Sequence, residues 1–179
     1  MRIVRYLPLL GALPLVGCLL SGQFVVSFDI QNPLDITSPS NVIPIPIDLT
    51  TESVYNDYKE DISGIVDAAL VGEIENAGTS AVDVEFWMTA GTTTYTTAAQ
   101  VRGDPGAVPV WGPVHLEPGA RQAIGWDESA ALFSGRQTLL GEVKGDGQFT
   151  LYPLGPSAAV AYRFIIHRGA LVVTIDAGM

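Results

Sequence analysis

The stretch IVDAALVGEIENAGTSAVDVEFWMT, residues 65–89, decides the fold class. Apolar and polar residues alternate on both sides of the turn-forming segment 76–80, which is typical of two β-strands with one buried face each. We expect these strands to pair as a β-hairpin at the centre of a sheet.

The polar face of this predicted hairpin is acidic. It carries Glu73 and Glu75 on the first strand and Asp83 and Glu85 on the second. Like charges on neighbouring strands repel one another. The four carboxylates are therefore expected either to spread into solvent, which is the simpler interpretation, or to share a cation.

Trp87 falls on the acidic side of its predicted strand, where a core residue is not expected. Exposed aromatic side chains beside carboxylates are common on surfaces that bind sugars or proteins. Trp87, Glu73 and Glu85 are therefore candidate ligand-binding residues for a glycan or a cation. The alternative is that a helix, such as the one predicted around Tyr55 and Tyr58, covers this face.

Alternating patterns continue on the N-terminal side of this stretch. Residues 24–30 have the period of a half-buried strand. Residues 42–49 carry Pro44 and Pro46 on one face, and only an edge strand tolerates prolines there because they donate no backbone hydrogen bond. Thr51 is expected to cap a short helix that contains Tyr55.

The C-terminal half is predicted to contain further short elements. Asp127 is expected to cap a short helix, and residues 137–144 are compatible with either a helix or a strand. The remaining predicted elements are strands at 92–101, 108–116 and 120–126 and a closing hairpin of 158–167 with 170–177 around Arg168-Gly169. Many short strands separated by turns are typical of a β-sandwich or barrel. We predict a mainly β domain over residues 24–179, namely a two-sheet antiparallel β-sandwich with one or two short helices.

The N-terminus is a segment of another kind. Arg2 and Arg5 precede an uncharged apolar run, residues 6–15. This run is too short to cross a bilayer, which takes about 20 apolar residues. A positive start followed by a short apolar run and small residues indicates a secretory signal peptide.

The end of this run, Leu15-Val16-Gly17-Cys18, resembles the lipobox of bacterial lipoproteins, and Cys18 is the sole cysteine of the chain. The resemblance implies that residues 1–17 are a signal peptide cleaved before Cys18. It also implies that the Cys18 thiol carries a diacylglycerol, with residues 18–23 as lipidated cysteine and short tether. The partner is then the lipid bilayer, and Leu19 in place of Asp favours the outer membrane. An ordinary leader with an incidental cysteine is the alternative, but no Ala-x-Ala-like site precedes Cys18.

Charge narrows the range of partners. The leader holds two of the nine basic residues and none of the 19 acidic ones, so residues 18–179 carry a formal net charge of −12. An acidic surface argues against nucleic acid and against electrostatic adhesion to anionic lipid. A disulfide within the chain is excluded because there is no second cysteine.

The sequence offers little catalytic chemistry. His115 and His167 are the only histidines, and neither a Gly-x-Ser-x-Gly elbow nor a phosphate-binding glycine loop is present. His115 and Glu117 could supply two metal ligands, but zinc takes three or four. We therefore predict no catalytic residue, no metal and no cofactor.

Three functions are compatible with these patterns. The first is a non-enzymatic envelope lipoprotein that acts as a structural or protein-interaction module, with an envelope protein as a possible partner. The second is a glycan- or cation-binding lipoprotein module that uses Trp87 and the nearby carboxylates. The third, an envelope hydrolase, requires His115 or His167 to meet a nucleophile in a cleft.

Overall fold

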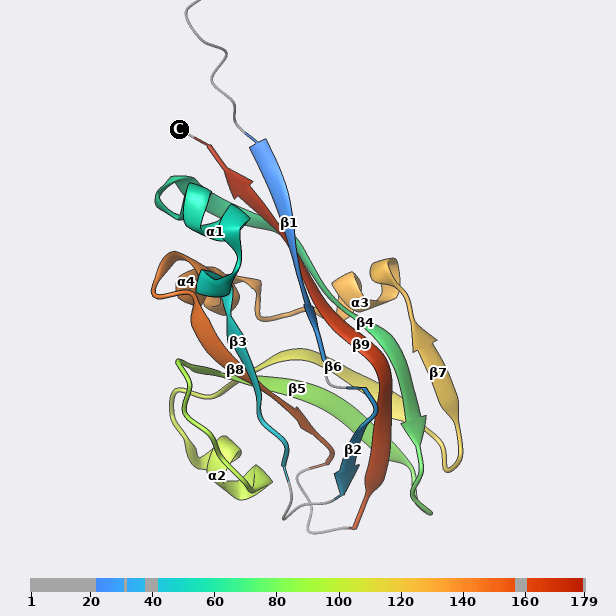
Figure 1. Ribbon diagram of the computed structural model, residues 1–179. Helices are drawn as coiled ribbons and strands as arrows, with labels where there is room; N and C mark the ends of the chain where they lie inside the picture. The colour runs from blue at the N-terminus through green and yellow to red at the C-terminus, as the bar shows by residue number, and fades with distance from the viewer. Residues whose placement is uncertain (1–21, 31, 38–41, 157–160, 179) are drawn as a thin grey trace, which may run out of the picture.

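The computed structural model describes residues 22–30, 32–37, 42–156 and 161–178. Two antiparallel sheets face one another (Figure 1), which confirms the predicted β-sandwich. Sheet A has the order β1-β9-β4-β7, with β2 also paired to β9, and sheet B has the order β3-β8-β5-β6.

Sheet A consists of β1 (Gly22–Asp29), β2 (Leu34–Thr37), β4 (Ile62–Asn76), β7 (Arg121–Ile124) and β9 (Arg163–Ala177). Sheet B consists of β3 (Ile45–Asp48), β5 (Val82–Ala90), β6 (Val108–Leu116) and β8 (Gln148–Leu154). The described residues also form four short α-helices, where one or two were expected: α1 (Ser53–Tyr58), α2 (Ala98–Gly103), α3 (Trp126–Leu132) and α4 (Arg136–Lys144).

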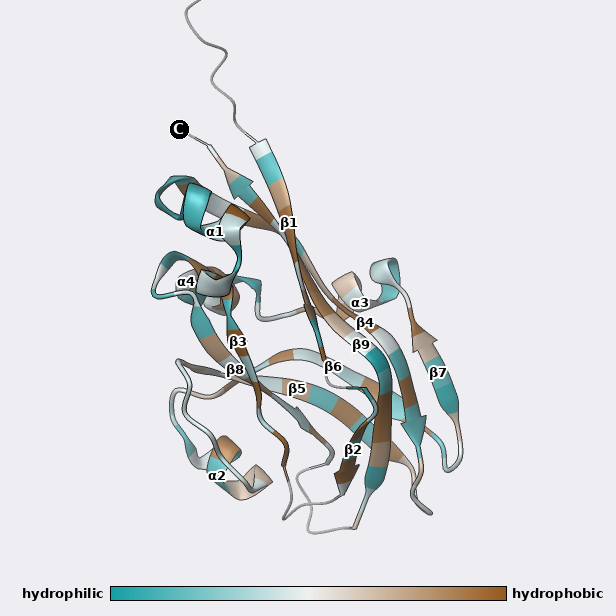
Figure 2. Cartoon of the chain, viewed as in Figure 1, coloured by the Kyte–Doolittle hydropathy of each residue, from teal (hydrophilic) through white to brown (hydrophobic). Residues whose placement is uncertain are grey.

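The core lies between the two sheets and is aromatic at its centre. Phe86 of β5 and Trp111 of β6 meet edge to face, with ring centroids 5.5 Å apart. Apolar residues alternate with polar ones along the strands (Figure 2), as the sequence pattern predicted. Sheet A contributes Ile74, Phe164 and Leu171 to the same core.

The predicted hairpin of residues 65–89 is wrong, because its two strands belong to different sheets. β4 pairs with β7 and β9, whereas β5 pairs with β6 and β8. Asn76, which is fully buried, fixes the crossing between the sheets: its side-chain amide donates to Ser80 O and Leu116 O, and its Oδ1 accepts from Gly78 N. The turn-rich segment therefore carries the chain from one sheet to the other.

The predicted closing hairpin is also wrong. Residues 163–177 form one long strand, β9, and Arg168-Gly169 is a β-bulge within it rather than a turn. In the pairing with β4, Val71 is opposite Ala170 and Glu73 is opposite His167, so Arg168 and Gly169 together face Gly72. Ile30 N donates to Gly169 O at 2.8 Å, and the other neighbour of β9 changes from β1 to β2 at this bend.

Two shorter predictions need correction. Residues 92–101 form a turn and the start of α2 rather than a strand, because Thr97 and Gln100 make a capping box at the helix start. Gly125, not Asp127, precedes the first residue of α3, so Asp127 lies in the first turn. The ambiguous segment 137–144 is helix α4.

Three other predictions are confirmed or adjusted. The predicted strand of residues 42–49 is shorter, because β3 spans Ile45–Asp48, and it is an edge strand of sheet B, as Pro46 within it requires. A helix, α1, follows Thr51, although Glu52 is its N-cap residue. The first strand begins at Gly22 rather than at Phe24, so it includes the last two residues of the expected tether, 18–23.

Candidate functional site

The proposed lipidation site, Cys18, lies outside the described residues and stays a prediction. The folded domain begins only four positions later, at Gly22. The start of β1, the end of β9 and helix α1 lie at the same end of the molecule (Figure 1). This end is therefore the one next to the predicted anchor.

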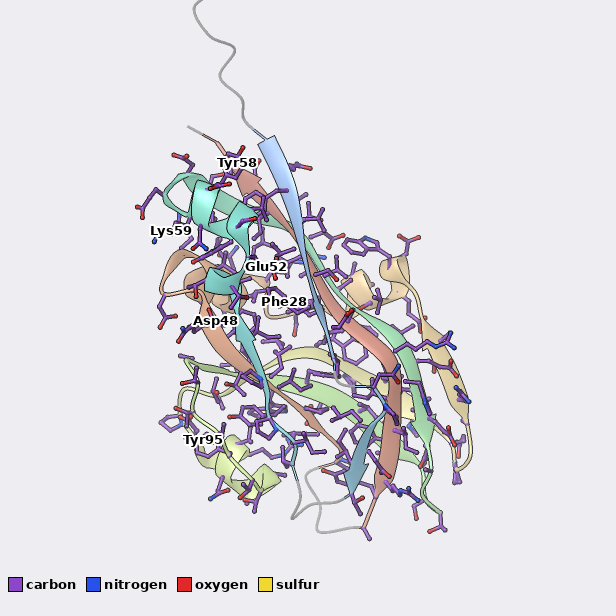
Figure 3. The ribbon with its side chains drawn as sticks, viewed as in Figure 1. Phe28, Asp48, Glu52, Tyr58, Lys59 and Tyr95 are labelled. Carbon is purple, nitrogen blue, oxygen red and sulfur yellow. The ribbon has the colours of Figure 1, made fainter. Side chains whose placement is uncertain are left out.

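A groove of about 350 Å³ lies between β1 and α1 at this end. The rings of Phe24 and Tyr58 stack in it, with centroids 5.7 Å apart, and Tyr58 is 48% exposed. Figure 3 shows Tyr58 on α1 beside the start of β1. The residues that line the groove are Gly22, Gln23, Phe24, Val54, Tyr58 and Ala177.

The four carboxylates do not form the expected acidic face. The two on β4 and the two on β5 lie in different sheets, and each has a basic partner of its own. Glu73 pairs with Arg121, and the other three pairs are Glu75 Oε2 with His167 Nε2 at 3.0 Å, Asp83 Oδ1 with His115 Nδ1 at 2.7 Å and Glu85 Oε1 with Arg102 Nη2 at 2.6 Å. Neither bare solvation nor a shared cation describes them.

Trp87 is half-buried on the outer face of sheet B and belongs to a second, smaller apolar cluster. The covering helix is α2, not the predicted helix around Tyr55 and Tyr58. Its neighbours in the cluster are Val42, Tyr95, Ala98, Val101, Ala107, Tyr152 and Leu154.

Arg102, on α2, completes this cover. Its guanidinium carbon lies 5.0 Å from the centroid of the Trp87 ring, and its Nη2 donates to Glu85 Oε1 and to Gly155 O at 2.8 Å. The structure therefore brings two of the three candidate ligand residues, Trp87 and Glu85, together around a cation of the chain itself. The third, Glu73, lies in the other sheet.

The sequence contains a partial signal for these pairs. The chain has few basic residues, so those that follow an acidic strand are natural partners. Which acid pairs with which base, however, depends on the neighbouring strands. Asp83 is directly opposite its partner His115 across β5 and β6. Glu73 is opposite His167 across β4 and β9, but its ion-pair partner is Arg121 of β7. Arg102, which sequence reasoning missed as a site residue, could not be assigned without knowing that α2 covers sheet B.

The two histidines make contacts with carboxylates. His115 Nδ1 lies 2.7 Å from Asp83 Oδ1, and its Nε2 lies 3.5 Å from Glu117 Oε1. Hydrogen bonds to Asp83 and then Glu117 raise the pKa of the His115 imidazole above its ordinary value. Across residues 22–178, outside the undescribed gaps, no three His, Cys, Asp or Glu side chains are grouped so that they could hold a metal ion.

Comparisons with known proteins give no family. No family model matches the chain, and no curated protein matches it. Within the described residues, no helix has the length and apolar character needed to cross a membrane.

Three of the similar solved structures are viral. The infectious bursal disease virus Gt strain structure matches at 15% identity over 94% of this chain and 36% of that chain, with a TM-score of 0.37. Turnip yellow mosaic virus matches at 12% identity over 100% of this chain and 92% of that chain, with a TM-score of 0.33. Desmodium yellow mottle tymovirus matches at 18% identity, with a TM-score of 0.25. At these TM-scores the likeness carries no argument about function.

Proposed function

We propose that the chain is a bacterial envelope lipoprotein, held to the bilayer through acylated Cys18, whose β-sandwich acts as a structural or protein-interaction module without catalysis. The observation that carries the proposal is Leu15-Val16-Gly17-Cys18, in which the sole cysteine ends an apolar leader. Two or more acyl chains give firm attachment, at about 0.8 kcal/mol per buried CH₂.

The start of the fold sets how far the anchored domain would lie from the membrane. From Cys18 to Gly22 an extended chain spans at most about 14 Å, so the anchored domain would lie directly on the membrane surface. The mature chain carries a net charge of −12 and has no electrostatic attraction to anionic lipid. Attachment would therefore depend on the acyl chains alone, with the outer membrane favoured by Leu19.

Among the described residues, the side-chain hydrogen-bond partners of both histidines are carboxylates and not hydroxyl groups. His115 lies on β6 of sheet B and His167 on β9 of sheet A, and each ring contacts a carboxylate of the neighbouring strand. An envelope hydrolase would need one of these rings beside a nucleophile. The body of the domain then offers surface, rather than chemistry, to an envelope protein.

The glycan- or cation-binding alternative has weaker support. Trp87 is packed under α2 and Arg102, while Glu73 and Glu85 are neutralised by Arg121 and Arg102. A cation would have to displace an arginine from each carboxylate.

The test is the intact mass and membrane fractionation of the wild-type chain and of Cys18→Ala. The wild type is expected in the membrane fraction with the mass of residues 18–179 plus acyl chains, and Cys18→Ala is expected to be unprocessed and unacylated. Leu20→Ala, which leaves the cysteine and the preceding residues unchanged, is the matched control and should be acylated. A wild-type product that is soluble and carries no lipid would contradict the proposal.

A further inference from the structure

Within the part of the chain that the structure describes, β1 is a sheet edge to which no further strand is paired. Prolines interrupt both edges of sheet B, with Pro46 in β3 and Pro109 and Pro113 in β6. On sheet A, β2 and β7 have only four residues each, but β1 has eight, GQFVVSFD, with no proline and a single charge at Asp29. Long edges without proline or lysine are open to strand addition.

The open backbone groups of β1 can be assigned. Asp29 is opposite Ala170, and Ile30 N donates to Gly169 O, so Ile30 and Gly169 are a hydrogen-bonded pair. Bonding alternates along antiparallel strands, so the even-numbered residues of β1 bond to β9. The N–H and C=O groups of Gln23, Val25, Ser27 and Asp29 therefore point away from the sheet.

The sequence of this edge is nearly symmetric about Val26. Phe24 and Phe28 lie two positions on either side of Val26, and both are only partly buried against the core. Gln23 and Asp29 lie three positions away on either side. Val25 lies next to Val26 on the opposite face of the strand. Its side chain is 58% exposed, which is the largest exposure among the bulky apolar side chains of the described residues.

We propose that two copies of the chain join through β1, antiparallel, about a two-fold axis at Val26. Gln23 is then opposite Asp29 of the second copy, and Val25 is opposite Ser27 of the second copy, so all the open groups bond in about eight hydrogen bonds. The acidic end of each strand meets an amide that can donate to it, and within the two paired strands no like charges are opposite one another.

The groove beside β1 fits this pairing. Phe24 is opposite Phe28 of the second copy on the face that carries the Phe24–Tyr58 stack. The incoming Phe28 ring would enter the groove between β1 and α1, against Tyr58 and Val54. A register centred on Val25 would form only about six hydrogen bonds and would leave Phe28 outside the groove.

The test joins two differently tagged full-length copies by oxidation of engineered thiols. Directly opposite residues are within reach of a disulfide, whereas diagonal ones are not. Copies carrying Val25→Cys and Ser27→Cys are expected to give a mixed-tag dimer well above the two same-variant pairs. The wild type, with Cys18 alone, sets the background, and Val66→Cys, an exposed valine inside the same sheet, is the matched control.

A second measurement uses Val25→Pro, which removes only an outward N–H and so keeps the pairing with β9. Sedimentation in mild detergent should give a dimer for the wild type and a monomer for this variant, with unfolding unchanged within about 1 kcal/mol. A monomeric wild type, a Val25→Cys pair stronger than the mixed pair, or cross-links from Val25→Cys to another protein would each overturn the proposal. Intact mass of the same samples reports Cys18 acylation separately, so failure of the dimer and failure of the anchor are distinguishable.

Discussion

Arg102 lies over the indole of Trp87, with its guanidinium carbon 5.0 Å from the ring centroid and its Nη2 2.6 Å from Glu85 Oε1. One cation of the chain thus covers the tryptophan and neutralises the carboxylate that sequence reasoning had assigned to a ligand. The same relationship attaches α2 to the outer face of sheet B.

Arg102→Ala is therefore expected to destabilise the domain by about 1–3 kcal/mol, because it removes a cation–π contact and leaves the half-buried Glu85 without its partner. Urea unfolding measures the change. Arg163→Ala is the control, since its pair with Asp35 is more exposed and should cost at most about 1 kcal/mol. An equal loss of unfolding free energy in the two variants would show that Arg102 contributes no more to stability than an exposed ion pair does.

Ser129→Ala is expected to cost about 1–3 kcal/mol in unfolding free energy. Ser129 is fully buried, and its Oγ accepts from Leu70 N at 2.6 Å and from Trp111 Nε1 at 2.9 Å. Removal of the hydroxyl leaves the Leu70 N–H without this acceptor where α3 packs on β4. Ser63→Ala, which loses an exposed hydroxyl, should change stability by less than about 0.5 kcal/mol. If Ser63→Ala cost as much as Ser129→Ala, the burial of the Ser129 hydroxyl would not explain its effect.

Gly72→Ala is expected to destabilise sheet A by about 1–3 kcal/mol. Gly72 has φ of 152°, and an added Cβ would come within 2.9 Å of Gly169 Cα at the bulge. Gly64→Ala is the control in the same strand, because nothing lies within 4 Å of its Cβ position. Thermal unfolding of both variants measures the difference, and the unfolding midpoint should fall for Gly72→Ala only. An unchanged midpoint for Gly72→Ala would contradict the bulge geometry.

Asp83→Asn is expected to lower the pKa of His115 toward the ordinary histidine value, with a smaller effect for Glu117→Gln, because the hydrogen bond to Asp83 is the larger cause of the upward shift. Since this pKa is raised in the folded protein, the stabilisation from the pair is complete below the ordinary value and is lost as pH rises through the folded-state pKa. An NMR titration of the imidazole measures both variants. Identical titration curves for wild type and Asp83→Asn would disprove the pairing.

The sequence predicted which face of each strand is buried better than it predicted strand neighbours. Alternation placed Ile45 and Ile47 inward, and the proline at position 46 placed their strand at an edge, because both properties belong to a strand by itself. A turn between two alternating segments, in contrast, is compatible with a hairpin and with a crossing between sheets. The strand pairings distinguish them, and these depend on residues far apart in the sequence, as does the contact of Asn76 with Leu116.

Neither the bulge in β9 nor the cover over Trp87 could be predicted from the sequence, because both depend on residues far away in the chain. Arg168-Gly169 has the composition of a hairpin turn, but its conformation depends on Gly72, far away in the chain. Trp87 was placed correctly on the outer face of its strand, while its cover comes from a threonine-rich segment that resembles a strand until the capping pair of Thr97 and Gln100 is recognised. The lipidation of Cys18, which stays a prediction, rests on a local motif and needs no tertiary information.

The antiparallel pairing of β1 with β9 joins the first described strand to the last. β1 cannot pair with β9 until residues 170–177 have been synthesised, so sheet A is completed only when nearly the whole chain is available. Contacts between residues this far apart in sequence make folding slow. The proposed signal peptide implies export of an unfolded chain, and this delay would suit it, because the sandwich cannot close while its C-terminal strand is still on the ribosome.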